Sequence, residues 1–295
     1  MRRILASAIA LALSTGSFAV AAQSAVAQPA VVDAVTTQLP RNVRPTHYTI
    51  EVTPHAEAMT FDGKARIDIE VLEATNMVVL QAIDMSFANS LLISAKGKPM
   101  VAKVSVDAQA QTATFAFDKP LAPGKYVLST DYTGKIGTQA NGFFALDYTT
   151  ASGKQRALYT QFENSDARRF IPSWDEPNYK ASFDLSVLAP AAQMVVSNMP
   201  AKTSADVGGG LKRTTFATTP KMSTYLLFFS MGDFDRSTLK TDDGVEIGVI
   251  SQKGKVEQAH FALQASRDVL REYNDYFGVK YPLPKLDNIA APGRS

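Results

Sequence analysis

The sequence of 295 residues contains no cysteine. Disulfide bonds, zinc sites with thiolate ligands and a lipid anchor on cysteine are therefore excluded. Histidine occurs three times, at His47, His55 and His260, and the only tryptophan is Trp174. After the N-terminal segment, no apolar run is long enough to span a membrane. The remaining composition, 45% hydrophobic and 20% charged, is typical of a globular protein that buries a core.

The first 27 residues have the order of charged, apolar and small residues that is typical of a secretory signal peptide. Arg2 and Arg3 precede an apolar run over residues 4–13, and small residues follow, ending in an Ala-Val-Ala site at Ala27. This run is too short for a membrane-spanning helix. We expect cleavage near Ala27, export to the periplasm or the extracellular space, and a flexible arm over residues 28–38. The alternative is a frayed apolar helix on a cytosolic protein.

The charge of the mature chain gives no support for a nucleic-acid partner. Loss of Arg2 and Arg3 reduces the 30 basic residues to 28, which equals the 28 acidic residues. Domains that bind nucleic acid or anionic membranes are usually strongly basic. We therefore expect no nucleic-acid partner and no membrane span.

Alternation of apolar and polar residues predicts a mainly β chain. Residues 47–53 and 65–71 alternate strictly, which is typical of strands with one buried face. Similar short runs occur at residues 78–80, 101–106, 112–117, 126–132, 143–148, 157–162, 195–197, 213–217 and 225–229. Because Gly and Pro punctuate these runs, we expect one large twisted antiparallel β domain over residues 39–238.

The pattern changes after residue 238. Apolar residues at three- and four-residue steps predict a helix over residues 255–277. Its apolar positions are Val256, Ala259, Leu263, Leu270, Tyr273 and Phe277. Gly278 is suited to end this helix, and a strand is expected over residues 286–291.

Residues 159–187 hold the densest cluster of charged and aromatic side chains. Thr-Gln-Phe-Glu at residues 160–163 fits an extended strand, in which Gln161 and Glu163 share one face. Asp-Ala-Arg-Arg follows at residues 166–169, and prolines bracket Ser-Trp-Asp-Glu at residues 173–176, which predicts a rigid corner. Judged by residue type alone, such a corner is usually structural and held by arginine–carboxylate pairs.

These submotifs, followed by Lys-Ala-Ser-Phe at residues 180–183, resemble the signature segment of the aminopeptidase N family of zinc metallopeptidases. Four submotifs in this order are more specific than one short pattern. The family often has cysteine at the position of Ser173. The resemblance extends over residues 39–295, and it implies a saddle-like β sandwich over residues 39–238, followed by the incomplete start of a thermolysin-like α/β catalytic domain.

The resemblance also implies a substrate-binding role for two residues. An aminopeptidase recognises a free α-amine, which is largely cationic at neutral pH because its pKa is about 8. A carboxylate in a closed pocket is its natural partner. In the family, the glutamate of Thr-Gln-x-Glu binds this amine and the glutamine lines the first substrate pocket, which correspond to Glu163 and Gln161. The alternative is that Glu163 pairs with Arg168 or Arg169.

The zinc motif of the family, His-Glu-x-x-His, does not occur in the sequence, since none of the three histidines is followed by glutamate. The family's Gly-x-Met-Glu-Asn motif is also absent. We therefore expect this chain to contain no catalytic residue and no metal site. It would be the N-terminal part of a longer enzyme that binds zinc and acts on peptides with a free N-terminus, and it would be inactive alone.

Two other functions are compatible with the sequence. A secreted, non-catalytic β module could use the same corner to bind a peptide or protein partner. A family member with altered chemistry, such as an epoxide hydrolase similar to leukotriene hydrolase, would also retain Glu163. Coding sequence that continued into the zinc motifs would favour the aminopeptidase.

Overall fold

The computed structural model describes residues 39–94, 97–150 and 153–292. The predicted signal peptide and the arm over residues 28–38 lie outside these residues. The described part of the chain contains eighteen strands, three 3-10 helices and one α-helix, which confirms the prediction of a mainly β chain. Within the same part, no helix is both long and apolar enough to cross a membrane.

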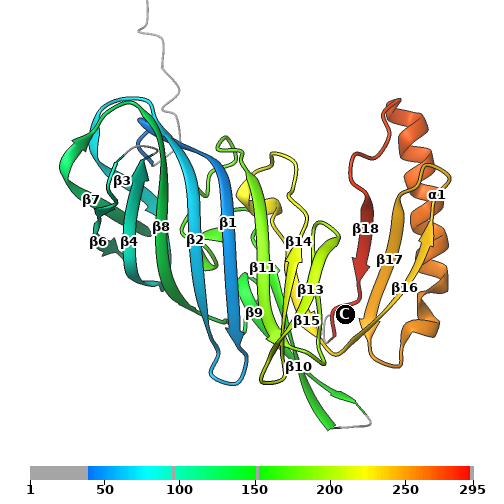
Figure 1. The fold of residues 1–295 in the computed structure, drawn as a ribbon. Helices are drawn as coiled ribbons and strands as arrows, with labels where there is room; N and C mark the ends of the chain where they lie inside the picture. Colours follow the sequence, from blue (N-terminus) through cyan, green and yellow to red (C-terminus); the bar gives the residue numbers. More distant parts are fainter. Residues whose placement is uncertain (1–38, 95–96, 151–152, 293–295) are drawn as a thin grey trace, which may run out of the picture. The chain divides into compact units, whose positions relative to one another are not determined.

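The largest element is an eight-stranded sheet (Figure 1). In spatial order its strands are β13 (Ala201–Gly208), β14 (Leu211–Phe216), β11 (Ser182–Pro190), β1 (Val43–His55), β2 (Thr60–Val71), β8 (Gly124–Lys135), β4 (Ser86–Ser94) and β5 (Met100–Val101). Neighbouring strands are antiparallel except β1 and β11, which run parallel with His47 opposite Ser182. Parallel neighbours need a long connection, and here the chain passes through β2 to β10 before it returns as β11.

Two smaller sheets share the core of the large sheet. One consists of β3 (Thr75–Gln81), β7 (Thr112–Leu121) and β6 (Lys103–Asp107), and the other of β12 (Met194–Ser197), β15 (Phe229–Gly232), β10 (Gly153–Gln161) and β9 (Gly142–Thr150). Ile50 and Ile67 of the large sheet, Phe115 of β7 and Phe229 of β15 belong to one buried apolar cluster. Because the apolar residues alternate along each strand, burial of one face leaves the polar face outside.

The last sheet is built around a helical crossover. It consists of β16 (Phe234–Lys240), β17 (Glu246–Gln252) and β18 (Lys285–Ile289), and β17 and β18 run parallel. Between them lie the 3-10 helix η3 (Val256–Ala259) and α1 (His260–Phe277), which confirms the predicted helix. Gly278 ends α1 with a φ of +64°, as predicted for a helix C-terminus. The predicted domain boundary after residue 238 falls within β16 and stays a prediction.

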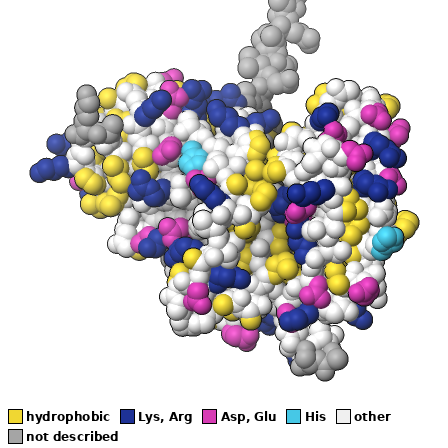
Figure 2. Space-filling model, turned by 45° about the vertical axis from the view of Figure 1, so that its right-hand side comes forward, with side chains coloured by type: hydrophobic (Ala, Val, Ile, Leu, Met, Phe, Trp, Pro, Cys, Tyr) yellow, Lys and Arg dark blue, Asp and Glu magenta, His cyan; other side chains and the backbone are white. Residues whose placement is uncertain are grey.

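The apolar side of α1 is only partly covered by its sheet. Leu263 and Leu270 pack against β17, but Tyr273 and Phe277 are 58% and 66% exposed. The apolar arc of the helix is wider than the side that contacts the sheet, so these rings remain at the surface. Figure 2 shows one face of the molecule, on which positive and negative side chains are interspersed.

The strand predicted at residues 225–229 was wrong. Residues Thr224–Leu226 form the 3-10 helix η2, and β15 begins at Phe229. Side-chain bonds explain the difference, because the Ser223 hydroxyl donates to the Pro177 carbonyl at 2.7 Å and the Thr224 hydroxyl donates to the Asp175 carboxylate at 2.9 Å. These bonds tie the start of the apolar run to the neighbouring corner and favour a turn over an extended strand.

Two glycines in the large sheet make room for aromatic rings. Gly63 lies opposite Tyr132 and Gly134 lies opposite Phe61, each pair joining β2 to β8. A Cβ atom at either glycine would overlap the ring of its partner. Each ring therefore covers a glycine backbone, a pairing that stabilises glycine within strands.

The hydroxyl of Tyr132 gives a test of this packing. Burial raises the pKa of Tyr132 above its ordinary value, and no described residue forms a hydrogen bond with its hydroxyl. The unfolded chain ionises tyrosine near pH 10 while the folded chain retains the proton, so the free energy of unfolding is unaffected below about pH 10 and falls above it. We expect Tyr132→Phe to be neutral at pH 7, or more stable by up to about 1 kcal/mol, and to reduce the fall above pH 10.

Urea unfolding at pH 7 and at alkaline pH measures both effects. Tyr48→Phe is the contrast, because the Tyr48 hydroxyl accepts a hydrogen bond from the Trp174 backbone at 3.3 Å, and its loss should cost about 1 kcal/mol at pH 7. A loss larger than this in Tyr132→Phe would contradict the packing described here.

Candidate functional site

Gln161 is the last residue of β10, and Glu163 lies in the turn that follows it. Thr160 and Phe162 are buried and Gln161 and Glu163 are exposed, but the strand predicted over residues 160–163 ends at Gln161. The Thr160 hydroxyl donates to the carbonyl of Phe229 at 3.2 Å and accepts from its backbone N–H at 2.9 Å. These inward contacts of Thr160 fix the end of the strand beside Gln161.

The turn after Gln161 is closed underneath by aromatic rings. Phe162 and Phe170, at its two ends, are fully buried with ring centroids 5.4 Å apart, and Phe170 also packs against Phe143 at 5.3 Å. The backbone N–H of Asp166 donates to the Phe162 carbonyl at 2.9 Å. Both ends of the turn are therefore held in the core, and between them Glu163 and Asn164 are exposed.

Arg169 links the same turn to strand β9. Its Nε donates to Asp166 Oδ1 at 2.8 Å, and its side chain lies across Gly142, the residue that pairs with Gln161 in the β9–β10 ladder. A Cβ atom at position 142 would lie 2.7 Å from both Cβ and Cδ of Arg169. Gly142 also has a φ of +64°, a conformation that favours glycine.

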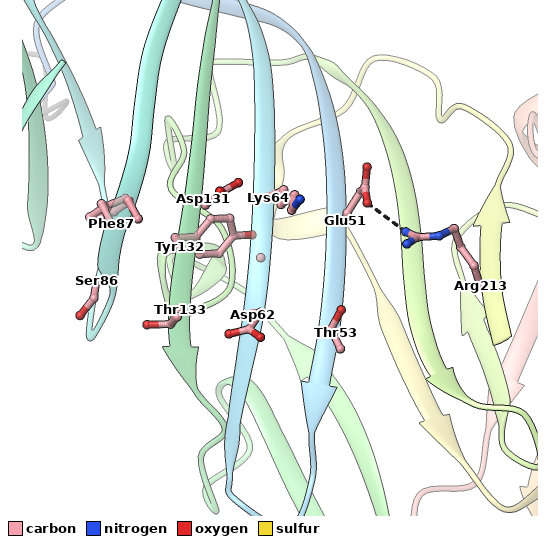
Figure 3. A pocket seen from close by; sticks show the side chains of 12 residues that line it. Glu51, Thr53, Asp62, Lys64, Ser86, Phe87, Asp131, Tyr132, Thr133 and Arg213 are labelled. Atoms are coloured by element: carbon pink, nitrogen blue, oxygen red, sulfur yellow. Dashed lines mark hydrogen bonds and ion pairs between the residues drawn. The ribbon is translucent and has the colours of Figure 1, made fainter. Parts of the chain in front are cut away.

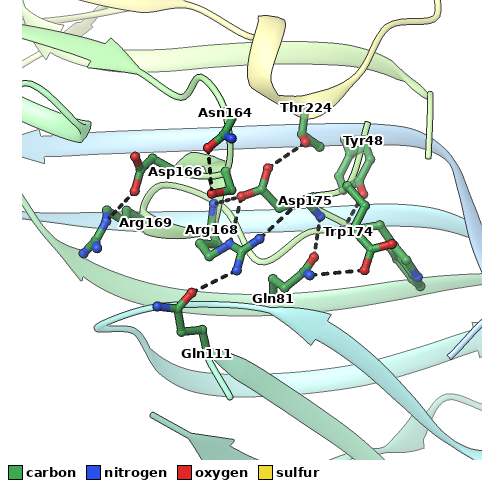
Figure 4. A network of polar contacts seen from close by, with 12 residues as sticks. Tyr48, Gln81, Gln111, Asn164, Asp166, Arg168, Arg169, Trp174, Asp175 and Thr224 are labelled. Atoms are coloured by element: carbon green, nitrogen blue, oxygen red, sulfur yellow. Dashed lines mark hydrogen bonds and ion pairs between the residues drawn. The ribbon is translucent and has the colours of Figure 1, made fainter. Parts of the chain in front are cut away.

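Arg168 and Asp175 form the buried centre of the corner (Figure 4). Arg168 Nε and the Arg168 backbone N–H donate to Asp175 Oδ2 at 3.0 and 3.2 Å, and the side chains are only 11% and 1% exposed. The Thr224 hydroxyl donates to Asp175 Oδ1 at 2.9 Å, and Arg168 Nη1 donates to Gln111 Oε1 at 2.9 Å. One carboxylate thus joins the turn to η2, and its arginine reaches the chain just before β7.

Gln81 at the end of β3 links this centre to Glu176, which also binds Leu39. Its Oε1 accepts the Asp175 backbone N–H at 2.7 Å and its Nε2 donates to Glu176 Oε1 at 3.3 Å. The Leu39 N–H donates to the same Glu176 oxygen at 3.1 Å. Trp174 beside them is 1% exposed, as expected of a core residue.

Sequence reasoning missed the polar partners of the corner. Gln81, Gln111 and Thr224 come from three distant segments. The one available signal was the polar Gln81 after the apolar residues 78–80, because a buried amide needs partners. Nothing in the sequence near Gln111 or Thr224 indicates the contact.

The alternative pairing of Glu163 is not observed. Arg168 pairs with Asp175 and Arg169 pairs with Asp166. Within the described residues, no hydrogen bond or ion pair joins Glu163 to a neighbour. The substrate-binding roles of Gln161 and Glu163 stay predictions.

The hollow in Figure 3 lies elsewhere, on the polar face of the eight-stranded sheet, and has a volume of about 390 Å³. Its carboxylates have partners, since Glu51 pairs with Arg213 at 2.9 Å and Asp62 pairs with His55 at 2.9 Å. Neither predicted substrate-binding residue lines it.

The described residues do not fit a metal centre. No group of three or more His, Asp or Glu side chains among them could hold an ion. The histidines lie apart, with His47 beside Asp184 at 3.3 Å, His55 beside Asp62, and His260 at the start of α1.

Comparison with known proteins gives the same family as the motifs. Residues 44–226 match the Peptidase M1 N-terminal domain. Aminopeptidase N of Acetobacter pasteurianus is 40% identical over 257 residues, which cover 87% of this chain and 71% of the relative. Puromycin-sensitive aminopeptidase of Caenorhabditis elegans and endoplasmic reticulum aminopeptidase 2 of Homo sapiens are 34% and 35% identical over 86% of this chain. The matched regions span only 27% of these two relatives.

Breaking the buried pair should be far more costly than breaking an exposed one. Arg168→Met keeps the aliphatic stem but leaves the Asp175 carboxylate buried without its cation, so we expect the free energy of unfolding to fall by about 3–5 kcal/mol. Arg44→Met is the matched control, because Arg44 and Glu70 are 54% and 31% exposed and their pair should contribute at most about 1 kcal/mol. Urea unfolding compares the two, and equal losses would contradict the central role of Asp175.

Proposed function

The chain belongs to the M1 peptidase family, and we propose that it is the substrate-recognition part of a zinc-dependent aminopeptidase that removes N-terminal residues from peptides. Within this chain, Glu163 would bind the α-ammonium group of the peptide. Gln161 would contact the first residue of the peptide or its carbonyl group.

The chemistry of the ligand supports this assignment. A peptide α-amine has a pKa of about 8 and is mostly protonated at neutral pH. A carboxylate accepts a charge-assisted hydrogen bond from it, which an amide accepts less strongly. Recognition of the charged amine would place the N-terminal residue of the peptide in the site. It would exclude peptides with an acylated N-terminus, which lack this charge.

The observation that carries the proposal is the pairing of charges in the corner, which leaves the Glu163 carboxylate without a cation. The two arginines that follow Glu163 in the corner are engaged by other carboxylates, Arg168 by Asp175 and Arg169 by Asp166. Glu163 is exposed beside Gln161 and has no cationic partner among the described residues. A carboxylate left in this position can accept an external cation.

The zinc that we propose for the whole enzyme has no ligand set among the described residues. The role proposed for this chain is therefore limited to binding and orienting the α-amine.

Loss of the Glu163 charge should abolish the preference for free amines. We expect the chain to bind trialanine more tightly than N-acetyl-trialanine, and Glu163→Gln to reduce that preference by about tenfold to a hundredfold, since a hydrogen bond to a charged group contributes about 1.5–3 kcal/mol. Titration followed by NMR measures both dissociation constants.

Glu51→Gln is the matched control, because Glu51 is an exposed strand glutamate that pairs with Arg213. It should leave the preference unchanged. If the unaltered chain bound both peptides equally, or if Glu163→Gln kept the preference, the proposed function would be wrong.

We also propose that the chain is exported and that residues 1–27 are removed. The support is the order of basic, apolar and small residues before Ala27. N-terminal sequencing and intact mass of the exported protein should give Gln28 as the first residue. Retention of Met1 in the exported protein would refute cleavage.

A further inference from the structure

Three kinds of contact stabilise the turn between Gln161 and Phe170. Phe162 and Phe170 fix its ends in the core, and the Asp166 N–H bond to the Phe162 carbonyl closes its backbone. The third contact is the ion pair between Arg169 Nε and Asp166 Oδ1 at 2.8 Å, which is partly exposed to solvent. Glu163 lies between Phe162 and Asp166, two residues after the end of β10 at Gln161.

The Arg169 side chain connects this turn to the neighbouring strand. Its stem lies across the backbone of Gly142, which is the register partner of Gln161. Only a residue without Cβ allows this approach, since a Cβ atom would lie 2.7 Å from two carbons of Arg169. One side chain thus contacts the turn that carries Glu163 and the strand that supports Gln161.

We propose that Arg169 is a positioning residue for the amine-binding pair Gln161 and Glu163. This inference rests on the proposed function. The guanidinium holds Asp166 and its stem covers Gly142, so that the turn keeps Glu163 at a fixed distance from Gln161. Arg169 itself does not touch the peptide.

The partial exposure of the Arg169–Asp166 pair distinguishes a local positioning role from a role in global stability. The Arg169 and Asp166 side chains are 35% and 24% exposed, in contrast to the buried pair of Arg168 and Asp175. Partly exposed pairs contribute little to global stability. Loss of the Arg169 pair should therefore loosen the turn while the fold remains intact.

The test uses Arg169→Met, which keeps a stem over Gly142 and removes the bond to Asp166. Asp166→Asn breaks the same pair from the other side, and Arg169→Lys keeps the positive charge but loses the guanidinium geometry. Arg156→Met is the control, because Arg156 forms a two-bond pair with Asp147 on the same β9–β10 hairpin, at 2.6 and 2.8 Å.

Amide hydrogen exchange is the first readout. We expect the exchange rate of the backbone amide of residue 166 to rise about tenfold in Arg169→Met and Asp166→Asn. The rate should rise less in Arg169→Lys and should not change in Arg156→Met. The urea midpoint should change little in the first two variants. Unchanged exchange of the Asp166 amide would overturn the positioning role.

The preference for trialanine over N-acetyl-trialanine is the second readout. We expect it to fall at least threefold in Arg169→Met and in Asp166→Asn, to recover in part in Arg169→Lys, and to persist in Arg156→Met. Faster exchange with an unchanged preference would overturn the role of Arg169 in recognition and leave the proposed function intact. Equal binding of both peptides by the unaltered chain would overturn the proposed function itself, whereas the exchange readout would still report on the turn.

Discussion

The buried ion pair between Arg168 and Asp175 is the contact on which the corner of this protein depends. A carboxylate that is 1% exposed is costly unless its oxygens are satisfied, and here Arg168 and the Thr224 hydroxyl supply the bonds. Through this pair and Gln81, segments far apart in the chain meet at one point. The charge is thus neutralised inside the fold and fixes the geometry around it.

This arrangement explains why the candidate site lies at the surface of a rigid corner. The two arginines of the corner make different contacts: Arg168 pairs with the buried Asp175, whereas Arg169 pairs with Asp166 and lies across Gly142. With both engaged, the carboxylate of Glu163 is available for an external cation. The proposed amine site would thus be supported by contacts that the fold already contains.

Local sequence patterns predicted most of the fold but not its long-range polar contacts. Period-two alternation identified most of the strands, and α1 followed from its three- and four-residue steps. The apolar run that begins at Tyr225 was misread, because its conformation is set by bonds from Thr224 to Asp175 and not by its own residues. Likewise, alternation put Gln161 and Glu163 on one face, whereas the bonds from Arg168 to Asp175 and Gln111 depend on tertiary structure that no local pattern encodes.

A crystal structure of the chain with a bound tripeptide would test the central claim most directly. We expect the peptide N-terminus to lie within hydrogen-bond distance of the Glu163 carboxylate, with the first residue beside Gln161 and the bonds of Asp175 unchanged. A peptide bound at the hollow near Glu51 and Asp62 instead, with Glu163 still solvated, would contradict the account.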